Sequence, residues 1–158
     1  MVAEWGAEIA EKCSATIVLE NKNRILWNLR DDKPGIWAPN TWALIGGQVE
    51  PGESLLMAAM REVQEEVGLD IRQRERWNAL WPILEYRGEA MQLSLVFGCC
   101  VDNTEADAVV CHEGREMKWM PLDVFTGRPL SYNGQRVVLA HHEAVVRWLA
   151  LYDTRLKQ

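Results

Sequence analysis

The chain has 158 residues, of which 48% are hydrophobic and 25% are charged, and its formal net charge is -6. This length is typical of one domain with a sizeable core, and the composition excludes disordered, collagen-like and disulfide-framework proteins. The acidic balance argues against non-specific binding of nucleic acid or anionic membranes, because both need clustered Lys and Arg.

The first third of the chain predicts a hairpin, a long loop and a short strand. Residues 13–20 and 24–29 are short apolar runs on either side of an Asn-Lys-Asn turn, which is typical of a β-hairpin. Residues 31–40 contain two prolines and a glycine and predict a loop. Residues 41–45 predict a short strand, and a glycine-rich loop is expected over residues 46–53.

The clearest predicted helix covers residues 54–67. Ser54 suits the N-cap, and Gly68 suits the left-handed residue that follows a helix. The apolar side chains recur with helical spacing and form one stripe, made of Leu56, Met60, Val63 and Val67.

The rest of the chain predicts three strands and a closing helix. Strands are expected over residues 77–86, 91–102 and 116–120, one helical turn over 121–125, and a helix over 137–152. Strands on both sides of a mid-chain helix, followed by a C-terminal helix, predict an α/β fold with a mixed β-sheet between helices.

Neither the apolar runs nor the cysteines indicate export or membrane insertion. The longest strongly apolar run, residues 93–101, is too short to span a bilayer, and the acidic N-terminus has no signal-peptide pattern. No CxxC pair exists among the cysteines, so we expect reduced and mostly buried thiols at Cys13, Cys99, Cys100 and Cys111. These features predict a cytoplasmic protein with a single domain over residues 1–158.

Three glutamates share one face of the predicted mid-chain helix. Glu62, Glu65 and Glu66 fall within an arc of roughly 100°, on the side away from the apolar stripe. Close carboxylates repel each other, and a hard cation such as Mg²⁺ would turn that repulsion into attraction, because it prefers oxygen ligands. A glutamate-rich helix face is most often a solvated surface, and it is the flanking residues that favour a metal site here.

Two of these flanking features would prepare the glutamates for a ligand. Arg61 can hold Glu62 in one rotamer through a forked ion pair, and Glu53 at the start of the helix can in turn hold Arg61. The glycine-rich loop before the helix lets the backbone come close to a ligand. Together these features predict a metal site beside a loop.

The segment from residue 46 to residue 69 resembles the Nudix box, the signature of the Nudix (MutT-like) hydrolase family. The box specifies residue types at fixed spacings, all of which are met here by Gly47, Glu53, Arg61, Glu62, Val63, Glu65, Glu66, Gly68 and Leu69. One departure is Ile45, where many members have proline. That change alters the stiffness of the loop but removes no catalytic group.

The resemblance implies a Nudix-type α/β/α sandwich. It also implies hydrolysis of a nucleoside diphosphate linked to another moiety, such as a (d)NTP, a nucleotide sugar or a dinucleoside polyphosphate. The implied cofactor is Mg²⁺ or Mn²⁺, and the implied metal ligands are the carbonyl of Gly46 with Glu62, Glu65 and Glu66. Such ions neutralise pyrophosphate oxygens and lower the pKa of a bound water.

The general base stays open between the helix and a later loop. Family members use a helix glutamate, here Glu62 or Glu66, or a loop carboxylate, here Glu113 or Glu116. Glu113 corresponds better, because it stands in a Glu-Gly pair shortly before a Trp-Met pair. An ordinary loop acid is an equal alternative for Glu113. We expect the helix glutamates to be the main metal ligands, with Glu113 in a supporting role.

Three further residues are candidates for substrate binding. Arg30 follows the second predicted strand, near the cleft that the family implies, where it can meet a phosphate or remain in a solvated loop. A nucleobase can stack on Trp37, and Gly47 lies in the glycine-rich loop. The expected partner is a nucleotide, without nucleic acid or membrane partners, and a homodimer is left open. A nucleotide-sensing module and an RNA 5′-triphosphatase are disfavoured by the intact box and the acidic charge.

Overall fold

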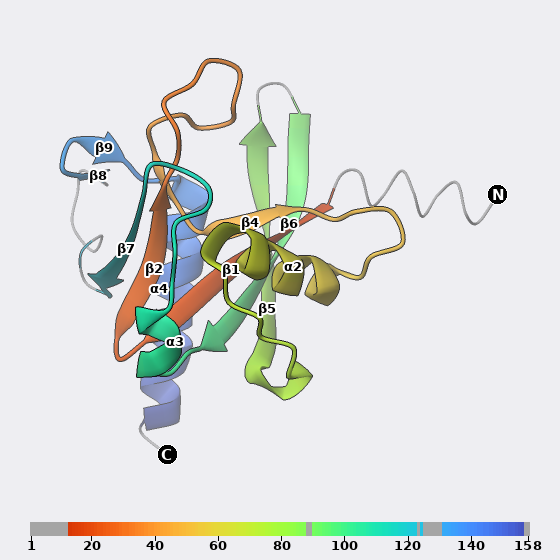
Figure 1. The fold of residues 1–158 in the computed structure, drawn as a ribbon, viewed down its shortest axis with the longest axis vertical. Helices are drawn as coiled ribbons and strands as arrows, with labels where there is room; N and C mark the ends of the chain where they lie inside the picture. The colour runs from red at the N-terminus through yellow and green to blue at the C-terminus, as the bar shows by residue number, and fades with distance from the viewer. Residues whose placement is uncertain (1–12, 88–89, 123, 125–130, 157–158) are drawn as a thin grey trace.

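The computed structural model describes residues 13–87, 90–122, 124 and 131–156. Within these residues, seven strands form one sheet, with the order β3-β2-β1-β6-β5, while β4 pairs with β1 and β7 pairs with β2 (Figure 1). The strands of the sheet are β1 (Cys13–Asn21), β2 (Arg24–Leu29), β3 (Trp42–Ala43), β4 (Ile45–Gln48), β5 (Trp77–Arg87), β6 (Ala90–Cys100) and β7 (Glu116–Pro121). A separate two-stranded ribbon pairs β8 (Ser131–Tyr132) with β9 (Gln135–Arg136).

The sheet is mixed, as the sequence predicts. β1 runs parallel to β6, whereas its pairings with β2 and β4 are antiparallel. The β1–β2 hairpin closes through Lys22 and Asn23, which both have positive φ.

Two long helices cover opposite faces of the sheet (Figure 1). Helix α2 (Leu55–Val67) lies against β1, β4 and β6, and helix α4 (Leu139–Leu156) lies against β1 and β5. A hydrophobic core lies on each face of the sheet, and neighbouring residues of β1 point to opposite cores. Ile17 packs in the core under α2, and Val18 packs in the core under α4. The result is the α/β/α sandwich that the sequence predicts.

The predicted helix over residues 54–67 is confirmed, including its ends. The Ser54 side chain accepts a hydrogen bond from the Met57 amide at 3.2 Å, and Gly68 has the left-handed φ of 76°. Because both caps satisfy backbone groups that a helix end leaves unpaired, the sequence could fix the boundaries to within one residue.

Several elements differ from the predictions. Residues 46–48 were expected in a loop but belong to β4, because they pair with residues 14–16 of β1. The 3-10 turn η1 (Arg74–Arg76) and the five-residue helix α3 (Asn103–Asp107) were not predicted. Pro121 ends β7 instead of starting a helical turn, and residues 123 and 125 of that predicted turn lie outside the described residues.

The cysteines match the predictions only in part. All four are free, but only Cys99 is buried, and both Cys100 and Cys111 are exposed. In the part of the chain that the structure describes, no helix is long and apolar enough to cross a membrane.

Candidate active site

Helix α2 carries the predicted glutamates on the side that meets β4. Glu62 and Glu66 are buried, while Glu65 is exposed. The sequence places these residues away from the apolar stripe, and the structure nevertheless buries Glu62 and Glu66. The reason is β4. Gly47 of this strand lies directly against the Glu62 carboxylate, and the Gly46 amide donates to Glu66, so the strand shields both carboxylates from solvent.

Arg61 makes the ion pairs expected from the sequence. Its guanidinium donates through Nε and Nη2 to the two carboxylate oxygens of Glu53, at 2.9 and 3.0 Å. Nη1 donates to Glu62 at 2.7 Å and to Glu65 at 3.1 Å. The hydrogen bonds from Arg61 hold the pKa of Glu53 below its ordinary value. One planar cation therefore fixes three carboxylates at once.

Glu66 is anchored at both carboxylate oxygens. The Gly46 amide donates to one oxygen at 3.0 Å, and the side-chain amide of Asn28 donates to the other at 3.2 Å. Burial, with smaller contributions from the charges of Glu62 and Glu113, raises the pKa of Glu66 to about 8. Burial likewise raises the pKa of Glu62, against the opposing effect of Arg61.

The two glycines of β4 allow this close approach. A Cβ on Gly47 would overlap the carboxylate of Glu62, and a Cβ on Gly46 would overlap the carbonyl of Ala15. Gly46 also has a φ of +153°, which side-chain-bearing residues rarely adopt. The family resemblance implies that the Gly46 carbonyl binds the metal, which stays a prediction, and the structure shows that the Gly46 amide donates to Glu66.

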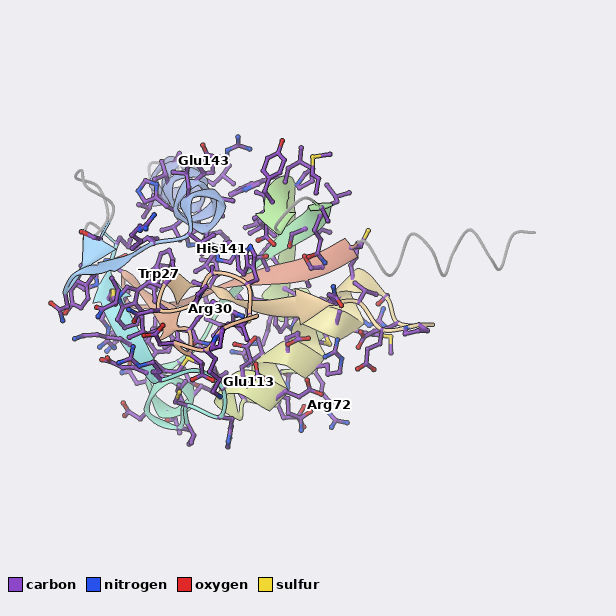
Figure 2. All side chains as sticks on the ribbon, turned by 90° about the horizontal axis from the view of Figure 1, so that it is seen from above. Trp27, Arg30, Arg72, Glu113, His141 and Glu143 are labelled. Atoms are coloured by element: carbon purple, nitrogen blue, oxygen red, sulfur yellow. The ribbon has the colours of Figure 1, made fainter. Side chains whose placement is uncertain are left out.

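The loop after α3 brings Glu113 to the same place. The His112 amide donates to the Glu66 carbonyl at 2.9 Å, and the Arg115 amide donates to the Leu29 carbonyl at 2.8 Å. These bonds tie the loop to α2 on one side and to β2 on the other. Figure 2 shows Glu113 on the side of the sheet that α2 covers, and Arg30 between Glu113 and His141.

One cavity of about 200 Å³ gathers most of the predicted substrate and catalytic residues. It is lined by Arg30, Trp37, Gly46, Gly47, Glu62 and Glu113, together with residues from both faces of the sheet. Arg30 donates to the Trp37 carbonyl at 2.7 Å, and its guanidinium lies 5.5 Å from the centre of the Trp37 ring. Glu53, Arg61, Glu65 and Glu66 do not line this cavity. Arg61 contacts Glu62, and Glu53 in turn contacts Arg61.

The donor set suits a hard divalent cation bound together with a substrate. Among residues 13–87, 90–122, 124 and 131–156, no three acidic, His or Cys side chains already surround one point that suits a metal. Mg²⁺ does not need such a cage, because it commonly uses one or two carboxylates with substrate phosphates and water. Glu62 and Glu113 supply carboxylates to the cavity, and the buried Glu66 lies next to them.

The structure adds two residues that the sequence did not indicate. Glu85 of β5 and His141 of α4 also line the cavity, and they contact each other at 2.6 Å. The sequence favours a structural role for His141, and nothing in the sequence distinguishes Glu85 from the other residues of its predicted strand. Only the packing of α4 across the end of β5 brings the two together.

Known proteins have sequences similar to this chain. The sequence profile of the NUDIX domain matches residues 12–142. The Xenopus laevis protein named m7GpppN-mRNA hydrolase NUDT17 is 30% identical over 70% of this chain, which spans only 41% of that relative. The Escherichia fergusonii protein named nucleoside triphosphatase NudI is 29% identical over 70% of this chain and 86% of the relative.

Solved structures show the same fold. A MutT protein from Methanosarcina mazei superposes with a TM-score of 0.71 at 21% identity, covering 89% of this chain and 94% of the other. A C. elegans Ap4A hydrolase superposes with a TM-score of 0.68 at 19% identity, covering 90% and 98%. At these identities the likeness concerns the fold alone.

Proposed function

The chain belongs to the NUDIX domain family, and we propose that it is a metal-dependent hydrolase that cleaves the pyrophosphate bond of a nucleoside diphosphate linked to another moiety. The observation that carries this proposal is the shared cavity: Glu62 and Glu113 face it from the side of α2, and Arg30 and Trp37 face it from the loop after β2. A carboxylate pair opposite a cation and an aromatic ring suits a metal-bound phosphate chain attached to a base.

The metal ligands in this proposal are Glu62, Glu65 and Glu66, with the carbonyl of Gly46. The bound Mg²⁺ or Mn²⁺ supplies neutralisation of the pyrophosphate oxygens and a more acidic water. Arg61 holds the Glu62 carboxylate against Gly47, which lines the cavity. Glu53 acts on Glu62 through Arg61, which it holds in a forked ion pair.

The proposed contacts with substrate lie on the opposite wall. Arg30 can place its guanidinium against a phosphate, since a planar fork matches phosphate oxygens. The Trp37 ring offers a stacking surface for a base. Gly47 also lines the cavity, where its backbone can lie against the phosphate chain.

The water that attacks phosphorus needs a group to accept its proton. Glu62, Glu66 and Glu113 remain the candidates. The raised pKa of Glu66 lets this carboxyl hold a proton near neutral pH, but Asn28 and Gly46 already occupy its oxygens. Glu113 lines the cavity and is exposed, so we propose that it supports the helix glutamates there.

The wider setting in this proposal is a single-domain cytoplasmic enzyme. The free state of all four cysteines supports a reducing compartment. Whether two copies form a homodimer stays a prediction, which light scattering of the full chain can test.

A substrate panel tests the proposed function. The panel contains NTPs, dNTPs, nucleotide sugars, dinucleoside polyphosphates and a capped RNA oligonucleotide, each with Mg²⁺ or Mn²⁺ and with identification of both products. We expect cleavage within a pyrophosphate linkage, its loss in EDTA, and its loss in Glu62→Gln. Undiminished turnover after verified removal of metal would overturn the metal-dependent reaction, and no cleavage of any compound would overturn the enzymatic function.

A further inference from the structure

A larger cavity of about 550 Å³ adjoins the active-site cavity. The two cavities share Arg30 and Glu113 in their walls. We call the larger one the second cavity, and its lining includes Asn28, Arg30, Asp31, Lys33, Ile36 and Glu113. A ligand whose phosphates lie between Arg30 and Glu113 can therefore extend into both cavities.

Hydrogen bonds hold the two loops that form the second cavity. In the loop after β2, the Arg30 amide donates to the Thr41 carbonyl at 3.0 Å, and the Asn40 amide donates to the Asp31 carbonyl at 3.0 Å. Arg115, from the loop after α3, donates to the side-chain oxygen of Asn40 at 2.7 Å. The loops are thus tied to each other, so the cavity exists before a ligand binds, which lowers the entropic cost of binding.

The charges around the second cavity balance. Arg30 and Lys33 are cationic, whereas Asp31 and Glu113 are anionic, with His112 counted as neutral. Lys33 also donates to the Asp31 carboxylate at 2.7 Å. A chain of further phosphates in this cavity would meet as many anions as cations, so the lining offers it no net electrostatic attraction.

The second cavity offers little surface on which a base can stack. Apart from the imidazole of His112, none of its lining residues in the described part of the chain has an aromatic ring, and Ile36 is the large apolar one. The active-site cavity, in contrast, is lined by the indole of Trp37. A nucleobase therefore fits the active-site cavity better. The second cavity is left for the group on the other side of the pyrophosphate.

The side chains of the second cavity offer both donors and acceptors of hydrogen bonds. Asn28 is 4% exposed, and its Oδ1 atom has no partner among the described residues. Because buried acceptors are nearly always paired, this atom indicates a hydroxyl or a water at the cavity wall. An ionised phosphate oxygen cannot pair with it, since both are acceptors. Hydroxyl groups can donate to Asn28 and Asp31 and can accept from Lys33.

We propose that the second cavity binds a sugar, so that the substrates are nucleoside diphosphate sugars, an inference that rests on the proposed function. A sugar is uncharged, has no aromatic ring and carries several hydroxyl groups, each of which both donates and accepts. It therefore agrees with all three properties of the lining. A triphosphate tail conflicts with the balance of charge, and the second base of a dinucleoside polyphosphate conflicts with the scarcity of aromatic rings.

Equilibrium binding in EDTA measures the contribution of the sugar without any turnover. The probes form three sets, each with one base: ADP-glucose, ADP and ATP; UDP-glucose, UDP and UTP; GDP-mannose, GDP and GTP. For at least one base, we expect the wild-type chain to bind the sugar nucleotide roughly 10-fold more tightly than the diphosphate or the triphosphate. Two hydrogen bonds to hydroxyl groups have about that effect.

Two variants with opposite changes of charge separate sugar binding from phosphate binding. Asp31→Ala removes an anion and Lys33→Met removes a cation, yet both should reduce the preference for the sugar nucleotide over the diphosphate several-fold. A phosphate tail in this cavity would instead bind more tightly to Asp31→Ala and more weakly to Lys33→Met. Asp32→Ala makes the same change at an exposed neighbour outside the lining and should keep the wild-type preference. Circular dichroism checks that each variant folds.

Failure of this proposal differs from failure of the proposed function. Equal affinity for sugar nucleotides and diphosphates, binding of neither, or opposite effects of the two variants would overturn the sugar site. Metal-dependent hydrolysis of triphosphates or dinucleoside polyphosphates in preference to every sugar nucleotide would also overturn it, while leaving the enzyme function intact. Preferential binding of a sugar nucleotide without hydrolysis of any compound would overturn only the enzyme function.

Discussion

Arg61 and Glu66 show how single side chains of α2 are fixed by opposite means. Arg61 is held by charge, because Glu53, Glu62 and Glu65 surround its guanidinium. Glu66 is held by neutral amides, from Gly46 and Asn28, in a buried position. Substitutions at the two residues should therefore have different consequences.

Arg61→Lys should lower kcat/KM by roughly 10- to 100-fold while the fold survives, an effect typical of residues that orient metal ligands. Lysine keeps the positive charge but lacks the planar fork that contacts Glu53 and Glu62 together. Steady-state kinetics and thermal unfolding measure the two effects. Wild-type turnover in this variant would mean that Arg61 acts only as a surface charge.

Glu66 should make the metal-free protein less stable as pH rises. Its pKa is raised from 4.5 to about 8 on folding, so the folded chain holds more protons than the unfolded chain between these values. The free energy of unfolding should fall between about pH 5 and pH 8, by up to about 1.4 kcal/mol per pH unit. Urea unfolding of wild type and Glu66→Gln in EDTA measures this dependence, and parallel pH profiles would contradict it.

Glu113→Gln separates the loop from the helix as the source of the base. Loss of one general base typically costs ~10²–10⁴-fold in rate. Because we expect a supporting role, we predict a smaller loss at every pH tested. A large loss with unchanged metal affinity would assign the base to the loop. A large loss with weakened metal affinity would make Glu113 a ligand.

At the scale of elements, β4 and α2 together set the geometry of the site. The short strand is bound to β1 in register, and its two glycines let the backbone lie directly against the glutamate face. The N-cap at Ser54 and the left-handed Gly68 set the length of α2 and so the heights of Glu62 and Glu66 along it. The geometry of the site thus depends on backbone spacing as much as on carboxylates.

Gly47→Ala should strongly reduce activity and leave the fold intact. The new Cβ would overlap the Glu62 carboxylate, which can rotate away because it is the end of a flexible side chain. Gly52→Asn is the matched control, since Gly52 faces open space and Asn tolerates its left-handed backbone. Kinetics and circular dichroism compare the two variants, and equal activity would contradict a tight Gly47–Glu62 contact.

At the scale of the whole molecule, the sandwich creates a site that no single layer contains. α2 covers one face, α4 covers the other, and the loops after β2 and α3 meet at one edge of the sheet (Figures 1 and 2). A ligand bound there contacts both layers, so its binding should stabilise the whole fold.

Mg²⁺ should raise the midpoint of thermal unfolding at pH 8 by roughly 5–10 °C, at a concentration near 100 times its Kd. The shift should be smaller at pH 5, because metal ligands must be deprotonated. It should also be smaller in Glu66→Gln. Potassium chloride at the same ionic strength is the control, and the same midpoint with Mg²⁺ as with this salt would argue against a site in the free protein.

The sequence by itself determined the local elements and the chemistry of α2. Ser54 and Gly68 satisfied helix ends locally, and the spacing of Glu53, Arg61 and Glu62 predicted their ion pairs before any fold was known. These features depend on neighbours along the chain, which a periodic pattern encodes.

Only the tertiary structure decided which polar residues became buried. Residues 46–48 became a strand because β1 pairs with them, and that pairing buried Glu62 and Glu66. Glu85 and His141, 56 positions apart, met because α4 crosses the end of β5. Burial and long-range contact arise from packing between distant segments, and a pattern of residue types along one chain does not specify which segments will meet.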